Sequence, residues 1–488
     1  MGRGITIVGL GPGGPEGMTI EGRRVVDEAP RLLLRTTDHP AAQDIAARRA
    51  AESFDAAYDA GPSFEEVYRA IVQGVLDAGR LETGVVYVVP GDPMVGEATT
   101  LALLDAARAE GLPIRIVHAP SFLEACLEAA GLDALDGLQV ADGVELARSH
   151  FPRLSPDRPA LVGQVYSRLV ASEVKLTLLA QYPPQHKALV IDSAGSDRAR
   201  VEWMPLEELD RGEWFGTRTS VFVPPLAAPS AFETFQATIA HLRAPDGCPW
   251  DREQTSESLR PHLLEEAYET LEAIDSGSAS SLREELGDLL LQIVLQAQIA
   301  SESGDFTMAD VISGIQDKIV RRHPHVFGGL EVKDVDQVLH HWEHLKEGER
   351  ELAGGGKGAL DGVPRALPAL AQALEIQSRA RRVGLDWPAM PGARAKIDEE
   401  LAEVDSAADG PSREAEIGDL LFAVVNYARW LGVDPETALR GSNARFRRRF
   451  ARMEAEARAS GRSLRDLRPD AIDALWEAAK DAEDAGPA

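Results

Sequence analysis

Short apolar runs rich in β-branched residues alternate with amphipathic stretches over the first 223 residues. Helical periodicity appears between several of these runs, for example over residues 64–78 and 99–110. Strands that alternate with helices are typical of an α/β domain. The expected strands are Ile5–Leu10, Arg31–Leu34, Val85–Val89, Ile114–Val117, Val174–Leu179, Ala188–Asp192 and Ser220–Val223.

Beyond residue 231 the strand pattern stops and helical periodicity continues to the end of the chain. A proline-rich segment and a glycine-rich segment read as linkers. We predict an α/β domain at 1–223, a linker at 224–231, an all-α unit at 232–352, a linker at 353–366 and a second all-α unit at 367–488. The expected helices are Phe232–Leu242, Leu259–Ile274, Leu282–Ser301, Met308–Arg322, Val335–Leu352, Leu367–Val383, Ala393–Ala407, Arg413–Leu431 and Pro435–Ser460.

Net charge and cysteine content narrow the choice of function. The formal charge of −28 argues against general binding to nucleic acid or to anionic membranes, but it allows a nucleotide that arrives with Mg²⁺. The two cysteines, Cys126 and Cys248, lie far apart and fit a reducing cytoplasm. We expect no signal peptide, because the apolar run at the N-terminus is short and is soon interrupted by glycine. We expect no membrane span, because the chain has no apolar run of about 18 residues.

An acidic pattern occurs once in each predicted helical unit, as Glu-Glu-x-x-Glu followed by Glu-x-Gly-Asp and an apolar run. Residues three and four apart share a helix face, so two antiparallel helices can direct these acids to a common point. A hard divalent cation such as Mg²⁺ would relieve their repulsion, whereas the alternative is a solvated acidic face. Recurrence of the whole pattern favours metal binding. The acids are Glu265, Glu266, Glu269, Glu285 and Asp288 in the first copy, and Glu399, Glu400, Glu403, Glu416 and Asp419 in the second.

A glycine-rich loop follows the first expected strand. It contains Gly9, Gly11 and Gly13 and satisfies Gly-x-Gly-x-x-Gly, which indicates either a dinucleotide site or a tight turn that needs positive φ. A second loop, Gly91-Asp92-Pro93, follows the strand 85–89.

Together these loops resemble the cofactor loops of the tetrapyrrole (corrin/porphyrin) methylase family, and Ser121 stands where that family has a Pro-Gly-x-Ser segment. The resemblance implies S-adenosylmethionine bound by Gly9, Gly11, Gly13, Gly91, Asp92, Pro93 and Ser121.

The segment after the second expected strand departs from that family. It reads Leu-Arg35-Thr-Thr-Asp-His39-Pro40, which resembles the methylase-like domain of YabN-type fusion proteins. The resemblance implies kept cofactor loops, an altered substrate side, and a tetrapyrrole or another methyl acceptor as the partner of this domain.

The helical region resembles the MazG family of nucleoside triphosphate pyrophosphohydrolases. Gly-Cys-Pro-Trp250, Leu-Leu-Glu-Glu-Ala-Tyr-Glu and Arg-Arg-His-Pro-His carry the resemblance in the first unit, and Val-Gly-Leu-Asp-Trp387 and Asn-Ala-Arg445 carry it in the second. It implies metal ligands at the second and third glutamates of each Glu-Glu-x-x-Glu and at both acids of Glu-x-Gly-Asp, with Glu265 and Glu399 as accessory acids. It also implies Glu266, Glu269, Glu400 and Glu403 in catalysis, and a homodimer.

A triphosphate keeps negative charge after Mg²⁺ binds, so cations should face the acids. Lys396, Arg445 and Arg449 resemble the family's phosphate-binding positions in the second unit. In the first unit His262 replaces the lysine, and Lys318 and Arg322 supply positive charge. Trp250 and Trp387 can stack on a base or pack in a core.

The expected function is hydrolysis of nucleoside triphosphates to monophosphates and diphosphate, with at least half of the activity in the second unit. One alternative is a methyltransferase whose helical units serve only in assembly. Another is a ligand-binding regulator of hydrolysis.

Overall fold

The computed structural model describes residues 2–60, 63–212, 215–332 and 358–484, together with residues 334, 335, 337, 338, 341, 342 and 345. By its internal contacts the chain divides into two compact parts, an N-terminal part of residues 1–312 and a C-terminal part of residues 313–488.

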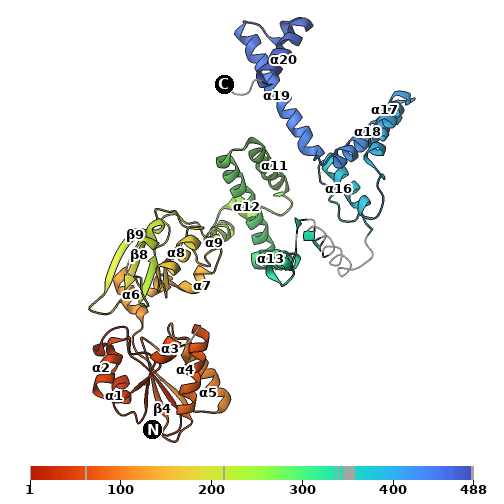
Figure 1. The fold of residues 1–488 in the computed structure, drawn as a ribbon. Coiled ribbons are helices and arrows are strands. Elements are labelled where there is room, and N and C mark those ends of the chain that lie inside the picture. The colour runs from red at the N-terminus through yellow and green to blue at the C-terminus, as the bar shows by residue number, and fades with distance from the viewer. Residues whose placement is uncertain are drawn as a thin grey trace. The chain divides into compact units, whose positions relative to one another are not determined.

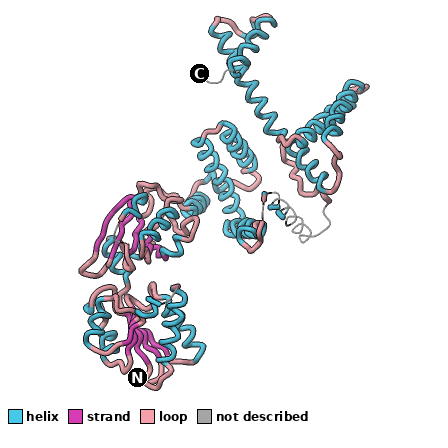
Figure 2. The backbone as a smooth tube through the Cα atoms, in the orientation of Figure 1, coloured by secondary structure: helices cyan, strands magenta, loops and turns pink. Residues whose placement is uncertain are grey.

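The chain begins with a parallel five-stranded sheet in the order β3-β2-β4-β1-β5. In Figure 1 this sheet, marked by β4, lies between α1 and α2 on one side and α4 and α5 on the other, and Figure 2 draws its strands in magenta. β4 is buried along its whole length because helices cover both faces of the sheet. Tyr87 packs with α4 and α5 on one face, and Val86 and Val88 pack with α1 and α2 on the other. The strands are β1 (Ile5–Gly9), β2 (Leu32–Leu34), β3 (Glu52–Ser53), β4 (Val85–Val89) and β5 (Ile114–Val117). The helices are α1 (Ile20–Asp27), α2 (Pro40–Arg48), α3 (Asp55–Ala60), α4 (Phe64–Gly79) and α5 (Ala98–Glu110).

A second five-stranded sheet follows, in the order β6-β7-β10-β8-β9, and only its β6–β7 pair is parallel. Its elements are α6 (Phe122–Ala130), β6 (Gln139–Asp142), α7 (Gly143–Ala147), β7 (Ala160–Gly163), α8 (Arg168–Leu178), β8 (Lys187–Asp192), β9 (Arg200–Pro205) and β10 (Thr219–Val223). The α/β fold class predicted for this region is confirmed, but β3, β6, β7 and β9 were not expected.

The strand predicted at Val174–Leu179 is wrong, because these residues lie mainly in α8. Ser167 caps this helix, since its side chain accepts a hydrogen bond from the backbone N–H of Val170. The buried residues Val170, Ala171, Val174, Thr177 and Leu178 follow helical spacing and cover one face. The apolar residues of this segment therefore follow the helical period of about 3.6 residues and not the strand period of two.

All described secondary structure after residue 231 is helical, as predicted. The helices of the N-terminal part after residue 231 are α9 (Phe232–Arg243), α10 (Pro249–Glu253), α11 (Arg260–Ser276), α12 (Ala279–Ser303) and the start of α13 (Met308–Arg322). The C-terminal part contains the rest of α13, α14 (Pro324–Phe327), α16 (Ala369–Arg382), α17 (Met390–Ser406), α18 (Gly410–Trp430), α19 (Pro435–Ala459) and α20 (Pro469–Asp484). Most of the predicted helix Val335–Leu352 and the start of the linker at 353–366 lie outside the described residues, although residues 335, 337, 338, 341, 342 and 345 are described and are helical. Within the described part, no helix is long and apolar enough to cross a membrane.

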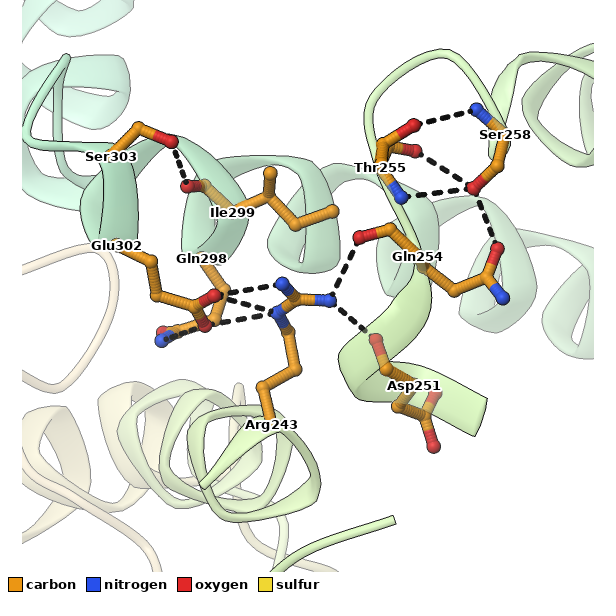
Figure 3. Close-up of polar contacts among 9 residues, drawn as sticks. All are labelled: Arg243, Asp251, Gln254, Thr255, Ser258, Gln298, Ile299, Glu302 and Ser303. Carbon is orange, nitrogen blue, oxygen red and sulfur yellow. Dashed lines mark hydrogen bonds and ion pairs between the residues drawn. The ribbon is translucent and has the colours of Figure 1, made fainter. Parts of the chain in front are cut away.

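Arg243 joins three helical segments of the first unit (Figure 3). Its buried guanidinium donates hydrogen bonds to the Glu302 carboxylate on α12, with an Nη2–Oε2 distance of 2.7 Å. It also donates to the backbone carbonyl oxygens of Asp251, within α10, and of Gln254, the residue after α10. A single arginine therefore fixes the segment that carries Trp250 against α9 and α12.

Candidate functional site

Three loops meet at the carboxyl ends of β1, β4 and β5. Gly11 and Gly91 exchange backbone hydrogen bonds, with N–O distances of 3.2 and 2.9 Å. Gly9 lies so close to the neighbouring loops that a Cβ atom there would come within 2.5 Å of the Gly91 carbonyl oxygen and 2.8 Å of Pro93 Cδ. The structure thus brings the predicted glycine loops together at the edge of the sheet where open α/β folds bind ligands.

The buried carboxylate of Asp92 holds two of these loops together. It accepts hydrogen bonds from the backbone N–H groups of Met94 (2.8 Å) and Ala119 (3.2 Å), and His118 Nδ1 lies 2.9 Å from its Oδ2. Burial acts to raise the pKa of Asp92, but these hydrogen bonds outweigh it and keep the pKa below its ordinary value. Ser121 has a similar structural part, because its hydroxyl caps α6 together with Glu124.

Gly91 and Gly13 offer different surroundings to a ligand. A Cβ atom on Gly13 would lie 2.3 Å from the carbonyl oxygen of Gly195, so that side of the loop is filled by protein. Gly91 has a φ of +63°, and no atom lies within 4 Å of the place where its Cβ would be. Its open side leaves room for a cofactor to approach the backbone.

The first acidic cluster lies on the antiparallel hairpin of α11 and α12 (Figure 1). Ligand oxygens of Glu266, Glu285 and Asp288 lie within 4.8 Å of one another. The Thr270 hydroxyl donates to the Glu266 carbonyl oxygen (2.8 Å) and lies 3.4 Å from the Glu285 carbonyl oxygen, which sets the two helices face to face. Burial and Asp288 raise the pKa of Glu266, and burial and Glu269 raise the pKa of Glu285. The cluster is electrostatically unfavourable without a cation.

The second cluster repeats this arrangement on α17 and α18. Ligand oxygens of Glu400, Glu416 and Asp419 again lie within 4.8 Å of one another. Glu400 is 5% exposed, and its Oε2 atom has no hydrogen-bond partner in the described structure. Lys396 Nζ lies 2.7 Å from Glu400 Oε1 and 2.8 Å from Glu399 Oε1. Burial and Glu400 raise the pKa of Glu403.

Two protein-family models match different parts of the chain. Residues 4–210 match the family model of tetrapyrrole (corrin/porphyrin) methylases, and residues 254–327 match that of the MazG nucleotide pyrophosphohydrolase domain. Over 488 residues the chain is 39% identical to the uncharacterized protein YabN of Bacillus subtilis, which covers 98% of this chain and 99% of that protein. The chain belongs to the YabN family.

The helical half of this YabN-family chain has its own relatives. It is 45% identical over 250 residues to the nucleoside triphosphate pyrophosphohydrolase/pyrophosphatase MazG of Thermotoga maritima, covering 51% of this chain and 95% of that protein. The nucleoside triphosphate pyrophosphohydrolase of Escherichia coli is 42% identical over 245 residues, covering 49% of this chain and 93% of that protein. The predicted fusion of a methylase-like domain with a MazG-type region is therefore confirmed.

The predicted phosphate-binding cations lie in different surroundings. Lys396 is at the second cluster, whereas Arg449 on α19 pairs with Glu483 of α20 (Nε–Oε2 2.6 Å). Arg445 lies one turn before Arg449 on α19, and Lys318 is exposed on α13, where Arg322 stacks over Trp342 at 5.8 Å. The structure therefore places the predicted phosphate-binding residue Lys396 beside Glu399 and Glu400 of the second acidic cluster.

The two candidate base-stacking tryptophans are both exposed. Trp250 is 56% exposed and Trp387 is 41% exposed, so neither is a core residue. Trp387 covers Gly392 in the first turn of α17, and Asp386 beside it accepts a hydrogen bond from Arg429 on α18 (2.6 Å). Trp387 is thereby held at the end of α17 that carries Lys396.

The sequence did not indicate a buried ion pair in the altered segment of the methylase-like region. Arg35 Nη1 lies 3.5 Å from Glu97 Oε1, and the guanidinium stacks over Tyr58 and Tyr68 at 5.4 and 4.7 Å. Arg35 and Glu97 come from separate loops 62 residues apart, which no short motif could connect. Gln164, at the end of β7, has a strained φ of +59° that no residue pattern predicted.

Proposed function

We propose that this protein hydrolyses nucleoside triphosphates to nucleoside monophosphates and diphosphate at its two acidic clusters. The observation that carries the proposal is the paired convergence of three carboxylates on consecutive antiparallel helices, with an unpartnered buried oxygen on Glu400. Such an oxygen is costly unless it binds something. The relatives named as nucleoside triphosphate pyrophosphohydrolases support the same reaction.

The donor atoms fit a hard divalent cation. Among the described residues, the ligand atoms that converge in each cluster are carboxylate oxygens, which suit Mg²⁺ rather than the softer metals that prefer sulfur or imidazole. Glu266, Glu285 and Asp288 would hold it in the first cluster, with Glu265 and Glu269 at the margin. Glu400, Glu416 and Asp419 would hold it in the second, with Glu399 and Glu403 at the margin. When bound, Mg²⁺ would neutralise charge on the phosphates.

The chain's own residues supply the remaining chemistry. The oxygen of a water molecule attacks the α-phosphorus, and the bond from this phosphorus to the oxygen bridging to the β-phosphate breaks. Glu403, whose pKa is raised by burial and by Glu400, is suited to take the proton of that water, because a raised pKa makes a better base. Glu269 has the corresponding place in the first cluster. Lys396 supplies positive charge for the phosphates, and Trp387 offers a face for the base.

The test is diphosphate release from a panel of nucleoside triphosphates with Mg²⁺. Replacing one acid in each cluster, Glu285→Gln with Glu416→Gln, should lower the rate by at least a hundredfold while the far-ultraviolet circular dichroism is unchanged. Glu284→Gln with Glu414→Gln is the matched control, since these exposed acids neighbour the cluster residues on the same helices. Full activity in the cluster double variant would disprove the assignment.

We further propose that the methylase-like region binds S-adenosylmethionine at the loops that contain Gly11, Gly91 and Asp92. The open side of Gly91 supports binding. Arg35 of the altered segment 34–40 is buried and pairs with Glu97, and this segment departs from the methylase pattern, so the proposal leaves the acceptor open to compounds other than a tetrapyrrole. Methyl transfer and ligand-dependent regulation of hydrolysis both remain compatible with this arrangement.

A homodimer is supported by a repeated exposed apolar stripe. Leu286, Leu290 and Ile293 on α12 are 50%, 38% and 42% exposed. Ile417, Leu421 and Val424 stand at the same distances from the cluster aspartate on α18 and are 44%, 52% and 43% exposed. Exposed stripes of this kind mark helix–helix interfaces, and a second copy of the chain offers a matching face. The two free cysteines fit a cytoplasmic location.

A further inference from the structure

The two acidic clusters differ at one position that faces the acids. Lys396 precedes Glu400 by one helical turn, and His262 precedes Glu266 by the same distance. Lys396 Nζ contacts Glu400 Oε1 at 2.7 Å and Glu399 Oε1 at 2.8 Å, whereas His262 Nδ1 lies 3.6 Å from Glu265 Oε2. Among the described residues, the second cluster therefore has a lysine in contact with its buried acid, whereas the first has a histidine near Glu265 at the same helical position.

The lysine engages the buried acid of its cluster. Glu400 is 5% exposed, so its charge is poorly solvated and its attraction to Lys396 is stronger than for a surface pair. The ammonium is bound through Oε1, while Oε2 is the atom left without a partner. A divalent cation that binds Glu400, Glu416 and Asp419 must enter beside this positive charge or displace it.

We infer that Lys396 is a built-in counterion that competes with the divalent cation at the second cluster, so that the first cluster binds metal more tightly. This inference rests on the proposed metal-binding role of the acids. It goes beyond that role because it assigns a different metal affinity to each cluster and attributes the difference to one residue. Displacement of the lysine by the metal would free its charge for a triphosphate.

The experiment measures Mn²⁺ binding to the full-length chain by calorimetry and by electron paramagnetic resonance, without nucleotide. Glu416→Gln disables the second cluster, so the binding that remains reports the first. Glu285→Gln disables the first cluster, so the remaining binding reports the second. We expect Mn²⁺ to bind the first cluster at least tenfold more tightly than the second.

Substitutions at Lys396 in the Glu285→Gln background identify the cause. Lys396→Gln should tighten Mn²⁺ binding about tenfold, whereas Lys396→Arg should keep it within threefold of the parent. Arg394→Gln is the matched control, because Arg394 is on the same helix and pairs with Asp398 away from the cluster. It should change the affinity less than twofold. Conversely, His262→Lys in the Glu416→Gln background should weaken binding at the first cluster.

Two results would be decisive against the inference. If Lys396→Gln leaves Mn²⁺ affinity unchanged, or lowers it, the lysine is not a competing counterion even though the clusters bind metal. If neither single-cluster background binds Mn²⁺, the metal assignment of the proposed function is wrong, and the inference is lost with it. Circular dichroism of each variant shows that the helices remain folded, so a loss of fold is not mistaken for either result.

Discussion

A matched pair of glycine substitutions separates cofactor binding from folding in the methylase-like region. Gly91 and Gly111 both have a φ of +63°, and neither has an atom within 4 Å of the place of a Cβ. An alanine in this left-handed conformation costs about 1–2 kcal/mol at either position. For a region of this size, that loss corresponds to a fall of roughly 2–8 °C in the unfolding temperature. We therefore expect Gly91→Ala and Gly111→Ala to destabilise the chain equally.

Only the first of these variants should affect the cofactor. The Gly91 methyl group would enter the open space beside the loop pair Gly11–Gly91, whereas Gly111 ends α5, outside these loops. Calorimetry with S-adenosylmethionine and S-adenosylhomocysteine should show at least a tenfold weaker affinity in Gly91→Ala and an unchanged affinity in Gly111→Ala. Equal affinities in the two variants would refute the placement of the cofactor at Gly91. If the unsubstituted chain binds neither ligand at about millimolar concentration, the loops serve the fold alone.

Three other changes test separate parts of the molecule. Glu403→Gln should remove at least half of the diphosphate release and Glu269→Gln the smaller share, and the reverse order in steady-state rates would contradict the predicted division of labour. Asp92→Asn should cost about 1–3 kcal/mol at pH 7. Hydrogen bonding lowers the folded-state pKa of Asp92. The stabilisation by its carboxylate is therefore present above the ordinary pKa and is lost as the pH falls through the lowered value. The free energies of unfolding of the unsubstituted protein and of Asp92→Asn, measured by urea titration, should converge below about pH 4. Arg243→Met should lower stability by about 2 kcal/mol in thermal unfolding, since its hydrogen bonds to the Glu302 carboxylate are charge-assisted, and an unchanged transition would show that the network contributes nothing.

The sequence predicted a helix or strand well where the spacing of its apolar residues and its flanking residues indicate the same structure. β4 is a continuous apolar run between Gly84 and Pro90, which leaves little choice of structure. β9 was missed because Arg200–Pro205 is an edge strand, largely exposed, with no apolar run to reveal it. The residues of α8 were misread because β-branched residues favour strands locally, while packing against the second sheet requires a helix.

Part of the acidic clusters could be predicted from the sequence, and part depends on how the helices pack. Helical spacing predicted that the acids of each repeat share a face, and the structure brings three from each repeat together. Which three converge depends on the rotation of one helix against the other, which in the first hairpin is set by the Thr270 hydroxyl. The pairing of Arg449 with Glu483 likewise depends on α20, a helix that the sequence pattern did not predict.

The acids and the apolar stripe of α18 can be tested independently, because they lie on different faces of the helix. At 100° per residue, Ile417, Leu421 and Val424 centre on a direction roughly 140° from that of Glu416 and Asp419. If the stripe is a dimer interface, Leu421→Glu should shift the sedimentation equilibrium towards the monomer while Mn²⁺ binding at Glu400, Glu416 and Asp419 persists. Leu421→Met keeps the apolar contact and is the matched control. A monomeric Leu421→Glu variant that binds Mn²⁺ but no longer releases diphosphate would mean that the partner copy completes the active site, whereas unchanged association would remove the stripe from the interface.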